Sequence, residues 1–195
     1  MATSMNDSTA VLEQAAKAQE SQSAALPNAR DLVTALQATE KSTKPEYTLA
    51  DLTGTWRLWF ITGTKKTRQK AGVALGAGRY LPKLIKIQLA YQATDETQGT
   101  VQNSVALGQL KLKLTGPVKF WANAHCLAFD FTQIQIAIAG FTLYQGRIKP
   151  ETADQGFYQQ PLKEQAFFKY FWVTHQGIAA RGRGGGLALW YRDDA

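Results

Sequence analysis

Few residues of this 195-residue chain have the types and spacing that catalytic chemistry needs. It contains one cysteine, Cys126, and two histidines, His125 and His175, and none of them lies in a recognisable catalytic motif. The sequence has no Gly-x-Ser-x-Gly elbow, so it does not indicate the nucleophile, base and acid of a hydrolase. His125 and Cys126 are neighbours, and on a strand they would face opposite ways, which argues against a shared metal site. The sequence therefore predicts no catalytic residue, no metal and no cofactor.

The clearest chemical signal is electrostatic. The formal net charge is +7, of which residues 1–46 carry −2 and residues 47–195 carry +9. Between Asp51 and Asp95 there is no acidic residue, whereas that stretch holds eight Lys or Arg. Two interpretations stay open: a solvated face that aids solubility, or a surface for an anionic partner such as membrane headgroups or nucleic acid. Nucleic-acid binding is the weaker alternative because no Lys/Arg-Gly-Phe type motif is present.

A cluster of cations directly follows the segment that we interpret as the first strand. A turn there would gather the cluster at one rim of the fold, where it would meet an anionic membrane surface. The residues expected to make this contact are Lys65, Lys66, Arg68 and Lys70.

Residues 52–63 predict the first strand of a closed antiparallel β-barrel. Gly54 and Gly63 bound a run of β-branched and aromatic residues, which suit a pleated, half-buried surface. A Gly-x-Trp at the start of such a strand is typical of small ligand-holding barrels, in which the Trp plugs one end and the Gly lets the backbone enter sharply. Strict alternation predicts two faces, an inner one with Trp56, Leu58, Phe60 and Thr62 and an outer one with Arg57, Trp59 and Ile61.

Short segments with period-2 alternation follow in quick succession, with no helix-length pattern between them. Gly116-Pro117 predicts a turn, and residues 148–165 predict a long loop. Eight or more such strands joined by hairpins indicate a barrel or a sandwich, and the Gly-x-Trp together with an Arg near the last strand favours the barrel. A closing Arg can stack on the opening Trp, and Arg181 is either that residue or a solvated turn residue.

The inward side chains of the predicted barrel form a packed core if the barrel is filled and the wall of a ligand site if it is hollow. The expected interior residues are Trp56, Leu58, Phe60, Ile87, Leu89, Phe129, Phe131, Tyr170 and Trp172.

The N-terminal part has a different composition. Residues 1–27 hold too few apolar side chains for a core, so we expect a disordered or frayed helical segment. Residues 28–46 predict an amphipathic helix and a linker, with Asn28 as N-cap and a stripe of Leu32, Ala35 and Leu36 that covers the barrel's outer apolar patch or its open end. Residues 47–195 form the barrel. No bilayer-spanning run, secretory signal or transit peptide is expected, and the single cysteine fits a reducing compartment.

Three motifs, in order along residues 49–192, resemble those of the plastid lipid-associated proteins, or fibrillins. The first is Leu52-Thr53-Gly54-Thr55-Trp56-Arg57-Leu58. The second pairs an aromatic-Gln and a nearby Asp with a Val-x-Asn strand, through Tyr91-Gln92-Ala93-Thr94-Asp95 and Val101-Gln102-Asn103. The third is the aromatic strand ending at Val173 with Arg181-Gly182 after it. The resemblance assigns structural roles to Gly54, Trp56, Gln92, Asp95, Asn103, Arg181 and Gly182.

What the resemblance implies is a mainly β, lipocalin-like antiparallel β-barrel with a short N-terminal helical extension. Relatives hold or organise lipophilic molecules such as carotenoids, quinones or fatty acids at thylakoid membranes or lipid droplets, and they support photoprotection. Val173-Thr174-His175 stands where the family usually has Tyr-Leu-Asp, which suggests a divergent branch. The expected lack of a transit peptide suits a cyanobacterial-type member rather than a plant-imported one. The alternative is an interaction or scaffold protein in photosynthetic assembly or in isoprenoid or quinone synthesis, with a filled barrel and no ligand.

Overall fold

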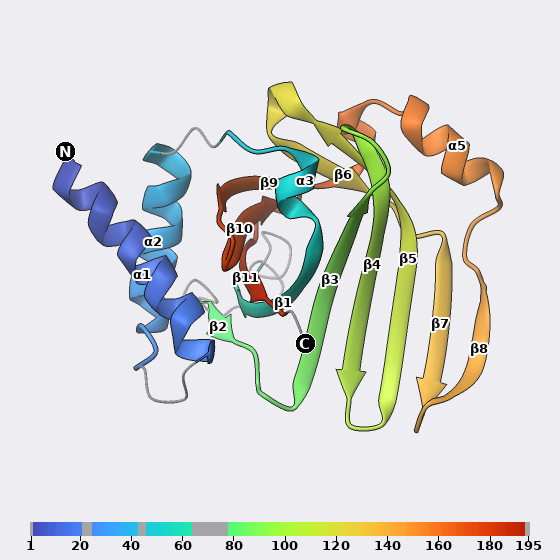
Figure 1. The fold of residues 1–195 in the computed structure, drawn as a ribbon, viewed down its shortest axis with the longest axis horizontal. Helices are drawn as coiled ribbons and strands as arrows, with labels where there is room; N and C mark the ends of the chain where they lie inside the picture. The colour runs from blue at the N-terminus through green and yellow to red at the C-terminus, as the bar shows by residue number, and fades with distance from the viewer. Residues whose placement is uncertain (1, 21–24, 43–45, 64–77, 194–195) are drawn as a thin grey trace.

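The computed structural model describes residues 2–20, 25–42, 46–63 and 78–193, and its strands form one antiparallel sheet (Figure 1). The strands are β1 (Gly54–Ile61), β2 (Arg79–Tyr80), β3 (Ile85–Ala93), β4 (Gln98–Leu107), β5 (Leu110–Trp121), β6 (Cys126–Phe129), β7 (Gln133–Ile138), β8 (Phe141–Arg147), β9 (Ala166–Val173), β10 (Gly177–Gly182) and β11 (Leu187–Arg192). The helices are α1 (Ala2–Glu20), α2 (Ala29–Ser42), α3 (Leu49–Leu52), α5 (Thr152–Gln159) and the 3₁₀ turns η2 (Ala122–Ala124) and η3 (Leu162–Glu164).

Eight of the described strands close into a barrel. Their order is β4-β3-β1-β11-β10-β9-β6-β5, and a second pairing between β5 and β4 completes the ring. The predicted mainly β, antiparallel barrel with N-terminal helices is therefore confirmed. β7 and β8 lie outside the ring, because β7 pairs with β5 and β8 pairs only with β7 among the described strands. They extend the sheet β3-β4-β5 sideways, away from α1 and α2 (Figure 1).

The extension exists because β5 changes partners halfway. Leu110–Thr115 of β5 pair with β7, whereas Val118–Trp121 pair with β6. Gly116-Pro117 lies at the changeover inside the strand, so the predicted turn there is wrong. The Pro117 carbonyl oxygen accepts from the Asp130 N–H at 3.1 Å, and a Cβ on Gly116 would lie 2.2 Å from the crossing Asp130 carbonyl oxygen.

Bulges in β1 and β9 move two predicted interior residues to the outside. The β1–β11 register shifts between Leu58 and Phe60, so Trp56 and Leu58 face inward and Phe60 faces outward. The β9–β10 register shifts in the same way, and Trp172 joins Phe60 in the outer cluster. The expectation that Phe60 and Trp172 share the inner face of Trp56 is wrong, because strict alternation does not allow for an inserted residue.

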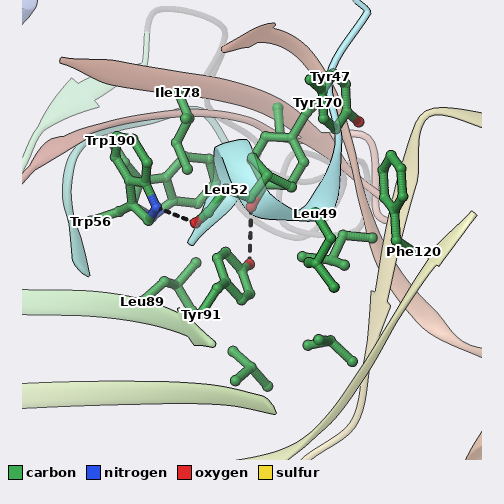
Figure 2. Close-up of a cluster of buried hydrophobic side chains, with 14 residues drawn as sticks. Tyr47, Leu49, Leu52, Trp56, Leu89, Tyr91, Phe120, Tyr170, Ile178 and Trp190 are labelled. Atoms are coloured by element: carbon green, nitrogen blue, oxygen red, sulfur yellow. Dashed lines mark hydrogen bonds between the residues drawn. The ribbon is translucent and has the colours of Figure 1, made fainter. Parts of the chain in front are cut away.

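The inner core fills the end of the barrel beside α3 (Figure 2). Leu49 and Leu52 of α3 are fully buried in it together with Trp56. The Nε1–H of Trp56 donates to the Leu52 carbonyl oxygen at 2.7 Å, and this hydrogen bond joins α3 to β1. Deeper in the core, the hydroxyl groups of Tyr91 and Tyr170 are 2.9 Å apart and hydrogen-bonded.

A second cluster lies between the helices and the outer face of β1, β9, β10 and β11. Leu32 and Leu36 of α2 are buried there, and Asn28 caps α2 through its Oδ1, which accepts from the N–H of Arg30 at 2.9 Å. α2 therefore covers the outer apolar patch, one of the two predicted positions. α1 packs on α2, and its Leu12 is fully buried in the same cluster. Residues 1–27 thus contribute to a core, contrary to the prediction, because a few apolar side chains suffice when a second helix completes the stripe.

The long loop predicted over residues 148–165 contains α5 and η3. α5 buries one large side chain, Phe157, which is 2 % exposed. A helix that contributes a single apolar anchor has no periodic stripe, and its sequence therefore resembles a loop.

Candidate functional site

At the end of the strands away from α3, the inner face of the barrel continues as an exposed apolar surface. Directly opposed residues on antiparallel strands share a face, so the strand register defines rows that cross β3, β4, β5, β7 and β8. The rim row is Ile85, Leu107, Leu110, Ile138 and Phe141. The middle row is Ile87, Val105, Leu112, Ile136 and Tyr144. The inner row is Leu89, Asn103, Leu114, Ile134 and Gly146. We call these three rows the open apolar face.

Exposure increases along this face from the core to the rim. Leu89 in the inner row is 5 % exposed, whereas Phe141 in the rim row is 75 % exposed and Leu107 is 54 % exposed. Such a continuous surface of large apolar side chains is unusual on a soluble protein and marks an interaction site. With strands about 4.8 Å apart and rows about 7 Å apart, the face measures roughly 19 by 14 Å.

One polar side chain interrupts the inner row of the open apolar face. Asn103 lies between Leu89 and Leu114, and its Oδ1 is buried without a hydrogen-bond partner. A buried amide acceptor without a partner costs about 1–3 kcal/mol, so its retention needs a reason. A ligand that lies on the open apolar face and carries a polar group could supply the missing hydrogen bond.

Aromatic side chains of β6, β9 and their connections border the face on the core side. The rings of Phe129 and Phe168 stack with centroids 5.0 Å apart, and Phe131 lies 5.5 Å from Phe129. All three are partly buried and pack against the inner core.

The α3 end of the barrel, which the inner core fills, is also closed by an Arg–Trp stack. The guanidinium carbon of Arg192 lies 4.7 Å from the Trp56 ring centroid, opposite it in the β1–β11 register. Arg181 instead pairs with Glu40 of α2, and its Nε–H donates to Oε1 at 2.6 Å. The closing residue is thus Arg192. Neither of the two alternatives left open for Arg181 holds, because it pairs with Glu40 instead of stacking on Trp56 and lies within β10 rather than in a turn. Arg181 holds α2 against the barrel.

The structure separates the residues that we predicted to lie inside the barrel into three groups. Trp56, Leu89 and Tyr170 are buried in the inner core, and Leu58, Phe129 and Phe131 pack against it. Ile87 belongs to the middle row of the open apolar face. Phe60 and Trp172 lie under the helices. Sequence reasoning missed most of this face, although its residues alternate as regularly as those of the core strands.

The motif residues occupy different places. Gly54 adopts φ +126, and a Cβ there would lie 2.6 Å from the Arg192 guanidinium. Asp95 accepts from the backbone N–H groups of Thr97 and Gln98, both at 2.8 Å, and these bonds hold its pKa below the usual range. Gln92 is exposed on the outer face, and Gly182 ends β10.

Two clefts of the described surface lie away from the open apolar face. One of about 700 Å³ lies on the outer face of β3, β4 and β5, below α5, and has a lining rich in amide and hydroxyl groups, among them Gln92, Gln102 and Tyr158. Another of about 720 Å³ lies beside α3, next to Phe120 and residues 95–97.

Burial favours the neutral forms of two tyrosines and of the cysteine. Burial raises the pKa of Tyr91 and Tyr170 far above the usual value, so their mutual hydrogen bond is that of two phenols. Burial also raises the pKa of the Cys126 thiol, which disfavours the reactive thiolate. The Nδ1 of His125 is buried without a partner.

Two further features bear on partners. No cluster of three or more potential metal ligands occurs in the part of the chain that the structure describes. None of the described helices is both long and apolar enough to cross a bilayer. The cations predicted to contact a membrane, Lys65, Lys66, Arg68 and Lys70, lie outside the described residues.

Comparison with known proteins adds a family. A family model described as PAP_fibrillin matches residues 2–158, which contain the first two sequence motifs but not Arg181-Gly182. A search of curated proteins finds no match. Among solved structures the chain is similar to a redesigned β-barrel, with 10% sequence identity, a TM-score of 0.34, and coverage of 75% of this chain and 95% of that chain.

Proposed function

We propose, because the chain belongs to the PAP_fibrillin family, that it is a non-enzymatic lipid-associated protein whose open apolar face binds a lipophilic molecule. The ligand is a carotenoid, a quinone or a fatty acid. The protein acts at the cytoplasmic face of thylakoid membranes or at lipid droplets and supports photoprotection, as a cyanobacterial-type member of the family. The observation that carries this proposal is the continuous apolar surface of β3, β4, β5, β7 and β8.

The energetics support a flexible, apolar occupant. Covering one Leu or Ile of the middle row, such as Leu112 or Ile136, contributes about 1.5–3 kcal/mol if the side chain becomes fully buried. A face of roughly 19 by 14 Å accommodates an extended acyl or isoprenoid chain lying across several strands. Asn103 gives a polar head group a hydrogen bond at the inner end of the face.

The packed core favours a second candidate function. Trp56, Tyr91 and Tyr170 fill the α3 end of the barrel with side chains that are at most 1 % exposed. A barrel that is filled over its whole length would suit a scaffold protein without a ligand, in photosynthetic assembly or in isoprenoid or quinone synthesis. In that case the open apolar face would bind a protein.

Mass spectrometry of organic extracts from the purified protein discriminates between the two functions. We expect carotenoid, quinone or fatty acid at near-stoichiometric amounts. Protein that carries no lipophilic molecule, and that binds none when titrated with a fluorescent fatty acid, would favour the scaffold function instead.

A matched pair of substitutions tests the location of the site. Ile136 faces into the middle row, whereas Ala137, the next residue of β7, faces outward beside a hollow bounded by Lys111 and Thr142. Ile136→Gln should weaken fatty-acid binding by a factor of about 10 or more, the equivalent of one lost apolar contact. Ala137→Gln should leave it within twofold of the wild type. Equal affinities of the two variants would place the ligand elsewhere.

A further inference from the structure

Three connections carry exposed apolar side chains to the same edge of the molecule. Leu84 lies between β2 and β3, Leu107 and Leu110 flank the β4–β5 hairpin turn, and Ile138 and Phe141 flank the β7–β8 turn. The three connections lie together at the lower edge of the sheet in Figure 1. We call these five side chains the tip surface.

These side chains are strongly exposed. Leu84 is 83 % exposed, Phe141 75 % and Leu107 54 %. The turns between them project freely, because a Cβ on Gly108 or Gly140 would meet no atom within 4 Å. Large apolar side chains on tight turns are costly in water and are suited to insertion into the boundary of a lipid layer.

Positive charges predominate around the tip surface. Lys83 directly precedes Leu84, and Lys111 directly follows Leu110; both lysines are exposed. Residues 52–94, 97–129 and 131–150 contain no Asp or Glu, so these connections and their strands have no acidic residue of their own. Asp193, from the end of the chain, pairs with Lys86 on β3. The acidic Asp95 and Glu96 lie in the β3–β4 hairpin at the opposite end of the strands.

We infer that the tip surface docks the protein on an anionic lipid bilayer, with the five apolar side chains inserted and the flanking lysines at the headgroups. Cations near such a surface are attracted within a Debye length, and apolar insertion adds an attraction that does not depend on headgroup charge. This inference rests on the proposed function, because the rim row of the open apolar face then opens directly onto the membrane from which the ligand comes.

Vesicle co-sedimentation of the full chain tests the inference. The vesicles are phosphatidylcholine alone, or equal parts of phosphatidylcholine and phosphatidylglycerol. Lys83→Gln/Lys111→Gln should reduce binding to the anionic vesicles by roughly 25-fold, about fivefold per lysine, and should not change binding to neutral vesicles. Leu84→Ser/Leu107→Ser/Phe141→Ser should reduce binding to both, by on the order of 100-fold. Wild-type binding should weaken as salt rises.

Matched controls carry the same substitutions elsewhere on the surface. Leu26 is 46 % exposed and precedes α2, and Lys41 and Lys163 are exposed on α2 and η3. Leu26→Ser and Lys41→Gln/Lys163→Gln should bind both kinds of vesicle as the wild type does. If the tip variants and the controls bind alike, or if the wild type binds neither vesicle, the docking surface is wrong.

Fatty-acid binding in solution separates this inference from the proposed function. The lysine variant leaves the open apolar face intact and should bind a fluorescent fatty acid like the wild type. If the wild type binds the fatty acid but no vesicles, the docking surface alone is overturned. If the wild type binds neither the fatty acid nor vesicles, the proposed function is overturned too. A wild-type dimer that the serine variant abolishes, with vesicle binding unchanged, would make the tip surface an interface between copies.

Discussion

The structure predicts opposite outcomes for alanine at two glycines that the sequence motifs treat alike, Gly54 and Gly182. Gly54 begins β1 with φ +126, a backbone conformation that L side chains rarely adopt. A Cβ there would also lie 2.6 Å from the Arg192 guanidinium. Gly182 has no such conformation, and its Cβ would meet Phe168 at 3.5 Å, an ordinary contact.

The cost of Gly54→Ala combines three effects. Holding alanine at this φ costs about 1–3 kcal/mol. The displaced guanidinium loses its stack on Trp56, which contributes about 0.5–2 kcal/mol, and its hydrogen bond from Nη1 to the Thr53 carbonyl oxygen at 3.1 Å, which contributes about 1 kcal/mol. Since partial relaxation recovers some of this, we expect a loss of about 2–5 kcal/mol in the free energy of unfolding. Gly182→Ala should change it by less than about 1 kcal/mol.

Urea denaturation followed by far-ultraviolet circular dichroism measures both variants under the same conditions. Equal m-values would show that the midpoint shift reports stability rather than a change in the unfolded state. Arg192→Gln provides an internal check, because Gly54→Ala should cost less in that background, where the stack is already lost. A loss below about 1 kcal/mol for Gly54→Ala, or equal losses at the two glycines, would refute the closure of the barrel by Arg192.

Two further predictions concern the packing of α1 and the loss of stability at low pH. Leu12→Ala should lower the free energy of unfolding by about 2–3 kcal/mol, because Leu12 is fully buried between α1, α2 and the barrel, whereas Glu13→Ala on the exposed side should change it by less than about 0.5 kcal/mol in the same urea titration. Hydrogen bonds from the Thr48 backbone to Asp51 and from the Thr97 backbone to Asp95 lower the pKa of both carboxyls in the folded state. The stability that these bonds contribute is therefore complete above the unfolded pKa of about 3.9 and is lost as pH falls through the folded pKa. Thermal midpoints should drop in that pH window, and the midpoint differences between the wild type and the variants Asp51→Asn and Asp95→Asn should shrink there.

The parts of the fold that local patterns determine could be predicted from the sequence. The alternation of β3 and β4, the Gly-x-Trp strand and the Asn28 cap of α2 all express preferences of short segments. The bulge after Leu58 could not be predicted, because one inserted residue reverses every later side chain of β1 without changing its composition. The closing Arg could not be identified for a related reason: Arg181 and Arg192 both lie near the last strand, and only the register puts Arg192 opposite Trp56.

The open apolar face was hidden for a different physical reason. Ile134, Ile136 and Ile138 alternate with polar residues just as barrel strands do, so period-2 reasoning predicts that β7 is a barrel strand. Whether β7 closes the ring depends on where β5 exchanges β7 for β6, and Gly116-Pro117 marks that point. The pair looks like a turn because glycine and proline are read as breakers, although here a carbonyl crosses above the glycine.

The same alternation therefore has two consequences, and which one applies depends on whether that part of the strand lies inside the ring or extends beyond it. Where β3, β4 and β5 lie inside the ring, their inward side chains are buried and stabilise the fold, as Leu89 and Val118 do. Where these strands extend beyond the ring with β7 and β8, the rows continue without the opposite wall, and Leu107, Leu110 and Phe141 stay exposed. Polar residues at the rim would keep the pairing of the strands and remove the cost of exposed apolar surface. Leucine, isoleucine and phenylalanine at the rim therefore contribute little to folding, and the proposed lipophilic ligand and bilayer are what would cover them.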